Sequence, residues 1–375
     1  MSEPIRVTRL ITWLPVGGIE RRLVSVLPRL RDRGFDVRLV CIREYGVLAD
    51  ELRESGVPVD LVELKSRLHP LGIRSLAAYL RQHRTQLVHA HMYRAAVPGT
   101  IAARLARVPV IYSQIHNVDS WDNGRQVLMD RFLARARTGV ICVSKAVRDD
   151  VCATLGLPRE KTPILYNGSD TETFQPDEDL RRRGREELGL DDNSLAVLVP
   201  ARLHSQKNPL GTLEAFAAAR EKADTPVVLL FAGKGPMEEE IRARIREHGL
   251  QDSVRLLGTR DDMPALYNAC DLMLLSSFKE GFSNAVVEAL ACGKPVVASD
   301  VGGNAEAISS RDFGWIHPPG DGDALTAQLA EAFSNPEALR SMASACRARG
   351  EVFSLDRLVE KTEKLYRDAI ARLPS

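Results

Sequence analysis

Two glutamates, Glu280 and Glu288, stand eight residues apart in the stretch EGFSNAVVEALACG. Ser283 and Asn284 lie between them and suit the start of a helix, because short polar side chains can cap its first N–H groups. Those N–H groups carry partial positive charge and favour a phosphate. Glu288, about one turn inside, could accept hydrogen bonds from a ribose diol, and Glu280 could hold hydroxyls on the far side of the phosphate. The alternative is two solvated glutamates beside a capped helix.

A second stretch, PARLHSQKNP, contributes two cations. Arg202 ends a predicted strand and Lys207 precedes the next predicted helix, five residues later. Two positive charges in one strand-to-helix loop suit a diphosphate. A surface loop held by salt bridges would show the same residues.

The first half of the chain places further polar residues after predicted strands. Gly17 and Gly18, in LPVGGIE, would let backbone N–H groups approach an anion, although a tight turn is the simpler interpretation. The stretches HAH and QIHN put His91 and His116 at two more strand ends. A histidine at such an edge favours function over a purely structural role.

Short β-rich runs alternate with helical patterns along the whole chain, which predicts parallel sheets of an α/β protein. The predicted strands are 5–12, 36–42, 57–64, 86–91, 108–116, 138–144, 195–202, 225–233, 253–258, 270–277 and 294–300. Two series of similar length predict two doubly wound, Rossmann-like domains, and 375 residues suffice for both cores. The polar stretch 166–189 suggests a boundary, giving domains 1–170 and 171–354. Ligands of such sheets bind beyond the carboxyl ends of the strands, where the residues above lie.

Charge is divided unevenly between the halves. Residues 1–170 hold 26 Lys and Arg against 17 Asp and Glu, a net of +9, and the remainder has a net of −8. The basic half is compatible with an anionic partner such as a membrane surface, or with an ordinary solvated surface. A nucleic-acid partner is not expected, because no motif combines aromatic and basic residues.

Six scattered cysteines form no CxxC pair or Cys/His cluster, so we expect reduced thiols and no metal site. The first residues lack the apolar core of a signal peptide, and no run approaches about 18 apolar residues. We therefore expect a cytoplasmic protein that could rest on the inner face of a membrane.

These motifs resemble those of family 4 glycosyltransferases. The similarity extends over GGIERRLVSVLPRLRDRGFDVRLV, VICVSKAVRDD, YNGSDTETFQP, ARLHSQKNP, EGFSNAVVEALACGKPVVASDVGGNAE and FSLDRLVEKTEKLYRDAI, which is nearly the whole chain. The resemblance implies the GT-B fold, with two Rossmann-like domains, an interdomain cleft and a C-terminal helix, about 355–375, that packs back on the first domain. It also implies that the first domain binds the acceptor and the second the nucleotide-sugar donor.

The resemblance implies roles for individual residues. Arg202 and Lys207 would bind the donor diphosphate, Glu280 the sugar hydroxyls and Glu288 the ribose, with His116 beside the sugar. The further donor contacts implied are Gly17, Gly18, Thr259, Arg260, Gly281, Phe282, Ser283 and Asn284. The catalytic set implied is His116, Arg202, Lys207 and Glu280. His91, Asn117 and Trp121 are expected near the acceptor, although Trp121 could equally be a packed aromatic. Lys234 departs from the family pattern, which leaves the contacts of the nucleobase open.

The resemblance further implies transfer with retention of anomeric configuration, without metal or cofactor, from a nucleotide-diphosphate sugar that family frequency makes a UDP-sugar. The acceptor would be a hydroxyl of a glycan or lipid-linked glycan, and the transferred group a hexose or N-acetylhexosamine. We expect membrane contact through the helix Arg21–Arg33 and the segment Arg125–Arg137. The oligomeric state does not follow from the sequence.

Two other interpretations remain open at this point. The chain could be a related GT-B enzyme acting on sugar nucleotides, such as an epimerase, which would turn over a nucleotide sugar without an acceptor. It could also be a nucleotide-sugar-binding protein without activity. Arg202, Lys207, Glu280 and Glu288 are all present, which argues against a decayed site.

Overall fold

The structure is a computed structural model that describes residues 3–191 and 193–373. The described residues form two compact units. The first contains residues up to Asn167 and those from Leu355 onward, and the second runs from Gly168 to Ser354. Each unit is a sheet covered by helices, as expected from strands that alternate with helices.

The first unit contains a six-stranded parallel sheet in the order β3-β2-β1-β4-β5-β6. Its strands are β1 Ile5–Ile11, β2 Phe35–Cys41, β3 Val59–Leu61, β4 Leu87–His91, β5 Val110–Ile115 and β6 Gly139–Cys142. The strand order changes direction between β1 and β4, which is the switch point of a doubly wound sheet. Both strands end in buried residues beside this point, so their carboxyl ends can present side chains to a ligand.

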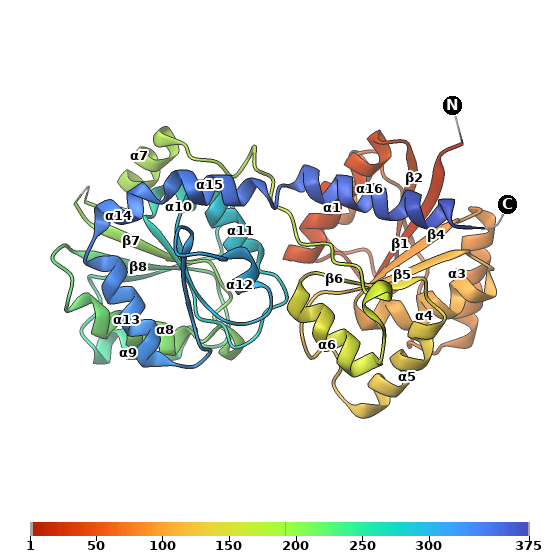
Figure 1. Cartoon of the computed structure of the whole chain (residues 1–375), viewed down its shortest axis with the longest axis horizontal. Coiled ribbons are helices and arrows are strands. Elements are labelled where there is room, and N and C mark those ends of the chain that lie inside the picture. The colour runs from red at the N-terminus through yellow and green to blue at the C-terminus, as the bar shows by residue number, and fades with distance from the viewer. Residues whose placement is uncertain (1–2, 192, 374–375) are drawn as a thin grey trace. The chain divides into compact units, whose positions relative to one another are not determined.

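Helices connect these strands and carry the apolar faces that cover the sheet. They are α1 Gly18–Asp32, α2 Ala49–Glu54, α3 Pro70–Gln82, α4 Met92–Leu105, α5 Gly124–Arg135, α6 Lys145–Leu155 and α16 Leu355–Ala371. The C-terminal helix α16 lies beside α1 (Figure 1). Its Val359 and Tyr366 join Leu23, Leu27 and Leu30 of α1 in one buried cluster, so the end of the chain completes the core of the first unit.

The second unit repeats this plan with the strand order β12-β11-β10-β7-β8-β9, again parallel throughout. Its strands are β7 Leu195–Val199, β8 Val227–Ala232, β9 Val254–Gly258, β10 Leu272–Leu275, β11 Val296–Ser299 and β12 Gly314–His317. The prediction of two parallel, doubly wound sheets is therefore confirmed. The sequence analysis missed β12, because four residues that begin with Gly314 at a φ of +140° give no β pattern.

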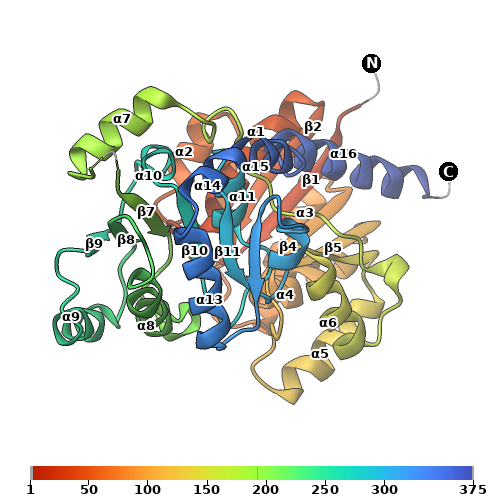
Figure 2. The ribbon, with the colours of Figure 1, turned by 60° about the vertical axis from the view of Figure 1, so that its left-hand side comes forward.

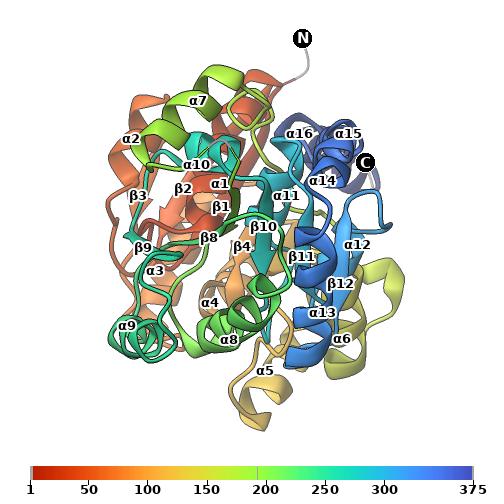
Figure 3. The ribbon, with the colours of Figure 1, turned by 90° about the vertical axis from the view of Figure 1, so that its left-hand side faces the viewer.

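The helices of the second unit are α7 Glu178–Glu187, α8 Pro209–Arg220, α9 Glu238–Glu247, α10 Met263–Ala269, α11 Asn284–Ala291, α12 Asn304–Ala307, α13 Gly322–Phe333, α14 Pro336–Ser341 and α15 Ala343–Glu351. Helices α8 and α13 pack side by side, and β10, β11 and β12 run next to one another (Figure 3). Among the helices of residues 3–191 and 193–373, none is both long and apolar enough to cross a membrane.

Candidate functional site

Lys207 and Glu280 meet at the carboxyl edge of the second sheet. Lys207 ends a short 3-10 turn after β7, Glu280 follows β10, and the Lys207 Nζ forms an ion pair with the Glu280 Oε1. The Ser277 hydroxyl donates a second hydrogen bond to the same carboxylate oxygen at 2.7 Å. Glu280 is buried, so its carboxylate is held by two partners in one orientation.

Arg202 lies in the same loop as Lys207, but its side chain is exposed. The loop itself is fixed by its backbone, since Leu203 N–H donates to the Lys234 carbonyl at 3.1 Å. Arg202 is therefore an exposed cation on an anchored loop, and Lys207 is held by its ion pair with Glu280.

The loop before α11 brings peptide N–H groups to the same edge. Ser283 occupies the N-cap position with extended backbone, but its side chain makes no capping hydrogen bond. The predicted cap is thus correct in position only, and the Ser283 side chain does not cap the first-turn N–H groups of α11, a kind of group that favours anions. Phe282 is buried against Phe353, with ring centroids 5.1 Å apart, so this residue anchors the loop and offers a ligand only its backbone.

Gly302, which the sequence analysis did not select, packs against the backbone of Glu280 and Gly281 in the loop before α11. Its φ is +55°, and a Cβ there would lie 2.3 Å from the Glu280 carbonyl oxygen. Gly303 N–H donates to the Gly281 carbonyl at 2.8 Å. The pair of glycines in DVGGN is the signal that could have identified this support.

Glu288 lies inside α11 and is only partly exposed. The Tyr267 hydroxyl donates to Glu288 Oε2 at 3.0 Å, and burial raises the pKa of this carboxyl to about 7. A carboxyl that titrates near neutrality can accept hydrogen bonds from a diol when ionised. No sequence pattern identified Tyr267, which lies 21 residues before Glu288.

The loop after β9 places Thr259 on the surface and ties Arg260 to its neighbours. Arg260 forms ion pairs with Asp262 and with Glu187, the latter at 2.7 Å. The hydrogen bonds that Arg260 donates to these two carboxylates raise the pKa of its guanidinium. The charge of Arg260 is thus already compensated within the loop and by Glu187.

In the first unit, Gly17 is the N-cap residue of α1 and Gly18 is the first residue of that helix. A Cβ on Gly17 would lie 2.4 Å from the Glu20 carboxylate, so a side chain there would displace Glu20. Glu20 is buried, and burial raises the pKa of its carboxyl. Gly17 therefore permits the close approach of the Glu20 side chain to the start of the helix.

His91 and His116 lie at the carboxyl ends of β4 and β5 and contact each other. His91 Nδ1 is 3.1 Å from His116 Nε2, and both rings also contact arginines, Arg9 and Arg22. Burial and the nearby guanidiniums lower the pKa of both histidines, so both are neutral. Arg9, in VTRLIT, is a charge inside an apolar strand, a signal that the sequence analysis did not use.

Asn117 lines a cavity of about 380 Å³ together with His116, at the same edge of the first sheet. Trp121 is partly buried and packs against the cluster of Tyr93, Val97 and Leu133. Its Nε1 donates to Asp130 Oδ2 at 3.0 Å. Trp121 is thus packed in this structure, and its contact with an acceptor stays a prediction.

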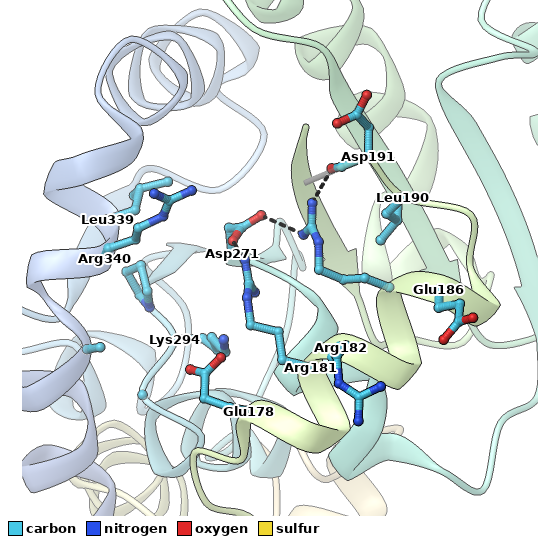
Figure 4. Close-up of a pocket in the computed structure, with 14 residues that line it drawn as sticks. Glu178, Arg181, Arg182, Glu186, Leu190, Asp191, Asp271, Lys294, Leu339 and Arg340 are labelled. Carbon is cyan, nitrogen blue, oxygen red and sulfur yellow. Dashed lines mark hydrogen bonds and ion pairs between the residues drawn. The ribbon is translucent and has the colours of Figure 1, made fainter. Parts of the chain in front are cut away.

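A larger cavity of about 930 Å³ lies elsewhere in the second unit (Figure 4). Its floor is an ion network in which Asp271 pairs with Arg181 at 2.7 Å and with Arg185 at 3.3 Å. Asp271 comes directly before β10, so this cavity lies at the amino ends of the strands, opposite the edge of Glu280. The network ties α7 to the sheet, and we assign the cavity a structural role.

Comparison with known proteins identifies the chain. Residues 16–173 match the family model Glycosyltransferase Family 4, and residues 181–349 match Glycosyl transferases group 1. EpsF of Bacillus subtilis (strain 168), assigned as a glycosyltransferase, is 31% identical over 319 residues, 80% of each chain. The Escherichia coli UDP-Gal:alpha-D-GlcNAc-diphosphoundecaprenol alpha-1,3-galactosyltransferase is 27% identical over 368 residues, 95% of each chain.

Solved structures show the same fold. The crystal structure of Anabaena HepE in complex with UDP has a TM-score of 0.86 and 24% identity, covering 97% of this chain and 100% of that one. The same protein in complex with UDP-glucose has a TM-score of 0.85. The chain has the GT-B fold of two Rossmann-like domains, and it belongs to family 4 of the glycosyltransferases, enzymes that transfer a sugar from a nucleotide sugar.

Proposed function

We propose that this enzyme transfers a sugar from a UDP-sugar, with retention of configuration and without a metal ion, to a hydroxyl of a lipid-linked glycan. The observation that carries the proposal is the Lys207–Glu280 ion pair beside the first turn of α11. It combines a fixed cation, a fixed carboxylate and peptide N–H groups at one edge of one sheet. The UDP and UDP-glucose complexes of HepE support uracil as the donor base.

The second unit would bind the donor. Lys207 and Arg202 would neutralise the diphosphate, assisted by the N–H groups of Gly281, Phe282, Ser283 and Asn284. Glu288 would accept hydrogen bonds from the ribose and Glu280 from the sugar. The backbone at Thr259 and Arg260 would contact the base.

Glycosyl transfer builds negative charge on the leaving diphosphate. Fixed donors at that position lower the barrier, and one such group contributes about 3–4 kcal/mol. Lys207 and the α11 N–H groups are held before the substrate arrives, so little reorganisation is needed. These groups would supply the charge that a metal ion supplies elsewhere.

Retention would follow from attack on the face that the diphosphate leaves. The bond between the anomeric carbon and the phosphate oxygen breaks, and the acceptor oxygen bonds to the same carbon. The acceptor proton passes to the released phosphate oxygen. Glu280, the carboxylate nearest Lys207, is held by two partners and so is placed for binding hydroxyls rather than for forming a covalent bond.

The first unit would bind the acceptor. The E. coli relative is named for an acceptor in which GlcNAc is joined by a diphosphate to undecaprenol, which supports a lipid-linked acceptor here. The cavity that contains His116 and Asn117 is also lined by Arg67 and Arg94, which would favour an acceptor with negative charge. His91 would hold the His116 ring in place through the contact between His91 Nδ1 and His116 Nε2.

Contact with an anionic membrane would bring the enzyme to such an acceptor. Helix α5, which packs against α4 and α6 (Figure 2), exposes Leu128 and Phe132 one turn apart, with 69% and 70% of each residue accessible. Three exposed arginines lie on the same helix, at Arg125, Arg131 and Arg135. Apolar and basic residues together suit the interface of a membrane.

The other predicted surface, α1, differs from its sequence expectation. Arg22 is buried, and Arg33 forms an ion pair with Glu363 of α16 at 3.0 Å. Arg29 lies 4.0 Å from Asp356 of the same helix. Much of the charge of α1 is therefore compensated by α16, and we place the membrane surface on α5 alone.

Calorimetric titration of UDP, GDP and ADP with EDTA present would test the donor site. We expect UDP to bind most tightly, and Lys207→Ala to weaken it. Transfer to a prenyl diphosphate sugar, with the anomeric configuration of the product read by NMR, would test the reaction. Turnover of UDP-sugar with no acceptor, or an inverted product, would contradict the proposal.

A further inference from the structure

Four side chains form a continuous row inside the first unit. Arg9 Nη1 lies 2.9 Å from His91 Nε2, His91 Nδ1 lies 3.1 Å from His116 Nε2, and Arg22 Nη2 lies 3.0 Å from His116 Nδ1. The row joins β1, β4, the end of β5 and α1, so it crosses the switch point of the sheet.

Both ends of the row are buried cations. Arg9 is 3% exposed and Arg22 is 8% exposed, and neither forms an ion pair with a carboxylate among the described residues. The charge of the buried Glu20, two residues before Arg22, opposes the lowering of the Arg22 pKa by burial without forming such a pair. Arg9 Nε and Arg22 Nη1 are buried without a hydrogen-bond partner. Buried charges are normally paired, because leaving water without a counter-charge is costly. Two buried guanidinium nitrogens in this row are therefore left without an acceptor.

The protons of the row cannot satisfy all three contacts. An arginine only donates, so His91 Nε2 and His116 Nδ1 must both be unprotonated to accept from Arg9 and Arg22. A neutral imidazole carries one proton, so both remaining protons would face each other between His91 Nδ1 and His116 Nε2. Two neutral rings thus carry one proton more than three hydrogen bonds can use.

One of the three contacts must therefore open, and burial decides which. Arg9 and His91 are 3% and 1% exposed, with no other described acceptor for the Arg9 Nη1. His116 is only partly buried and lines the cavity of about 380 Å³. When the contact between Arg22 and His116 opens, His91 donates to His116 Nε2. His116 then carries its proton on Nδ1, so two donors point at the space between it and Arg22.

We propose that Arg22 and His116 together bind a phosphate oxygen of a substrate, and that Arg9 and His91 are positioning residues that fix His116 in its Nδ1–H form. One anionic oxygen between them accepts from both groups and adds a negative charge directly beside Arg22. The cavity that His116 lines is also lined by Arg67 and Arg94 and by one carboxylate, Asp122, so its charged side chains add to the positive potential beside His116. The phosphate site itself does not depend on the proposed function. Only the identity of the molecule that carries the phosphate, sugar donor or acceptor, rests on that function.

NMR of protein labelled with 15N-histidine tests the site directly. We expect His116 in the Nδ1–H form, and we expect inorganic pyrophosphate to shift its ring signals. The affinity for pyrophosphate, read from this shift, should be at least tenfold weaker in Arg22→Gln. Arg31→Gln, which removes an exposed charge from the same helix, serves as the matched control and keeps the wild-type affinity. Arg9→Met leaves His91 Nε2 without its donor, so we expect His116 to become a mixture of tautomers.

Two further measurements identify which substrate carries the bound phosphate. If the phosphate belongs to the donor, UDP-glucose binds at least tenfold more weakly to Arg22→Gln. If it belongs to the acceptor, UDP-glucose affinity is unchanged and the KM for a short-chain prenyl diphosphate sugar rises at least tenfold, with kcat less affected.

Opposite results would overturn the inference: His116 in the Nε2–H form, or equal affinities for all three probes in wild type and Arg22→Gln. Arg22→Lys, which keeps the charge, replaces Arg22→Gln if the latter does not fold. A wild-type enzyme that transfers to no lipid diphosphate would instead contradict the proposed function, and the pyrophosphate titration would still decide the inference.

Discussion

Lys207 and Glu280 form an ion pair across 73 residues of sequence, at the carboxyl edge of the second sheet. Each residue fixes the other, since the ammonium orients the carboxylate and the carboxylate compensates the ammonium while no diphosphate is present. The two residues therefore act as one unit, and their effects on stability and on catalysis can be separated.

Removal of one partner should affect both properties. Lys207→Ala leaves Glu280 buried without its cation, which costs about 3 kcal/mol of unfolding free energy. We expect a fall of about 10²–10³ in kcat/KM, because the fixed donor on the diphosphate is lost. Thermal melting and steady-state rates would measure the two losses.

The double variant Lys207→Met with Glu280→Gln separates the loss of stability from the loss of activity. It removes both charges, so we expect stability to return most of the way while activity stays low. Recovery of activity in this variant would show that neither charge takes part in the reaction.

The pKa of Glu288 predicts a pH dependence of donor binding. With a pKa of about 7, the carboxyl is largely protonated at pH 6 and largely ionised at pH 8. If the ionised form binds the ribose, UDP-glucose should bind about tenfold more weakly at pH 6 than at pH 8. Calorimetry measures this, with Glu288→Gln as the control, in which the affinity should be lower and independent of pH over this range.

The same group should affect folding. The pKa of Glu288 is raised from 4.5 in the unfolded chain to about 7, so the folded state binds more protons between these values. Its contribution to stability is therefore complete below pH 4.5 and is lost as the pH rises through 7. Urea titrations at several pH values should show a smaller decrease over this window in Glu288→Gln than in wild type.

Gly302 should be needed for more than its backbone conformation. Gly302→Ala adds a Cβ 2.3 Å from the Glu280 carbonyl at a φ of +55°, so we expect lower stability and weak donor binding. Gly249 has a similar φ of +61° with open space around it. Gly249→Ala should cost about 1 kcal/mol and leave UDP affinity unchanged. Equal UDP affinities in the two variants would contradict a role for Gly302 under the site.

The exposed face of α5 should direct membrane binding. We expect wild type to float with anionic vesicles at low salt, and Leu128→Ser with Phe132→Ser to reduce the bound fraction several-fold. Val47→Ser, at another exposed apolar residue, is the control. Equal flotation of all variants, or no flotation of wild type, would remove α5 from the proposal.

Local patterns predicted most of the fold. Each of the eleven predicted runs overlaps a strand, because buried parallel strands are short apolar runs that can be recognised from local sequence. Strand β12 was not predicted because it has only four residues. The exposed positive charge expected on α1 was wrong in part, because α16, from a distant part of the chain, forms an ion pair with Arg33.

The sequence by itself determined the family, the two parallel sheets and the set of polar residues that follow the strands, since these depend on residue type and spacing along the chain. Their roles in binding remain predictions. Only the tertiary structure decided which of these residues touch. Three examples are the ion pair of Lys207 with Glu280, the hydrogen bond from Tyr267 to Glu288, and the row from Arg9 to Arg22. Each contact in them joins residues that are 21 to 94 positions apart in the chain. Such contacts depend on strand order and helix packing, which place side chains in three dimensions and leave no local pattern.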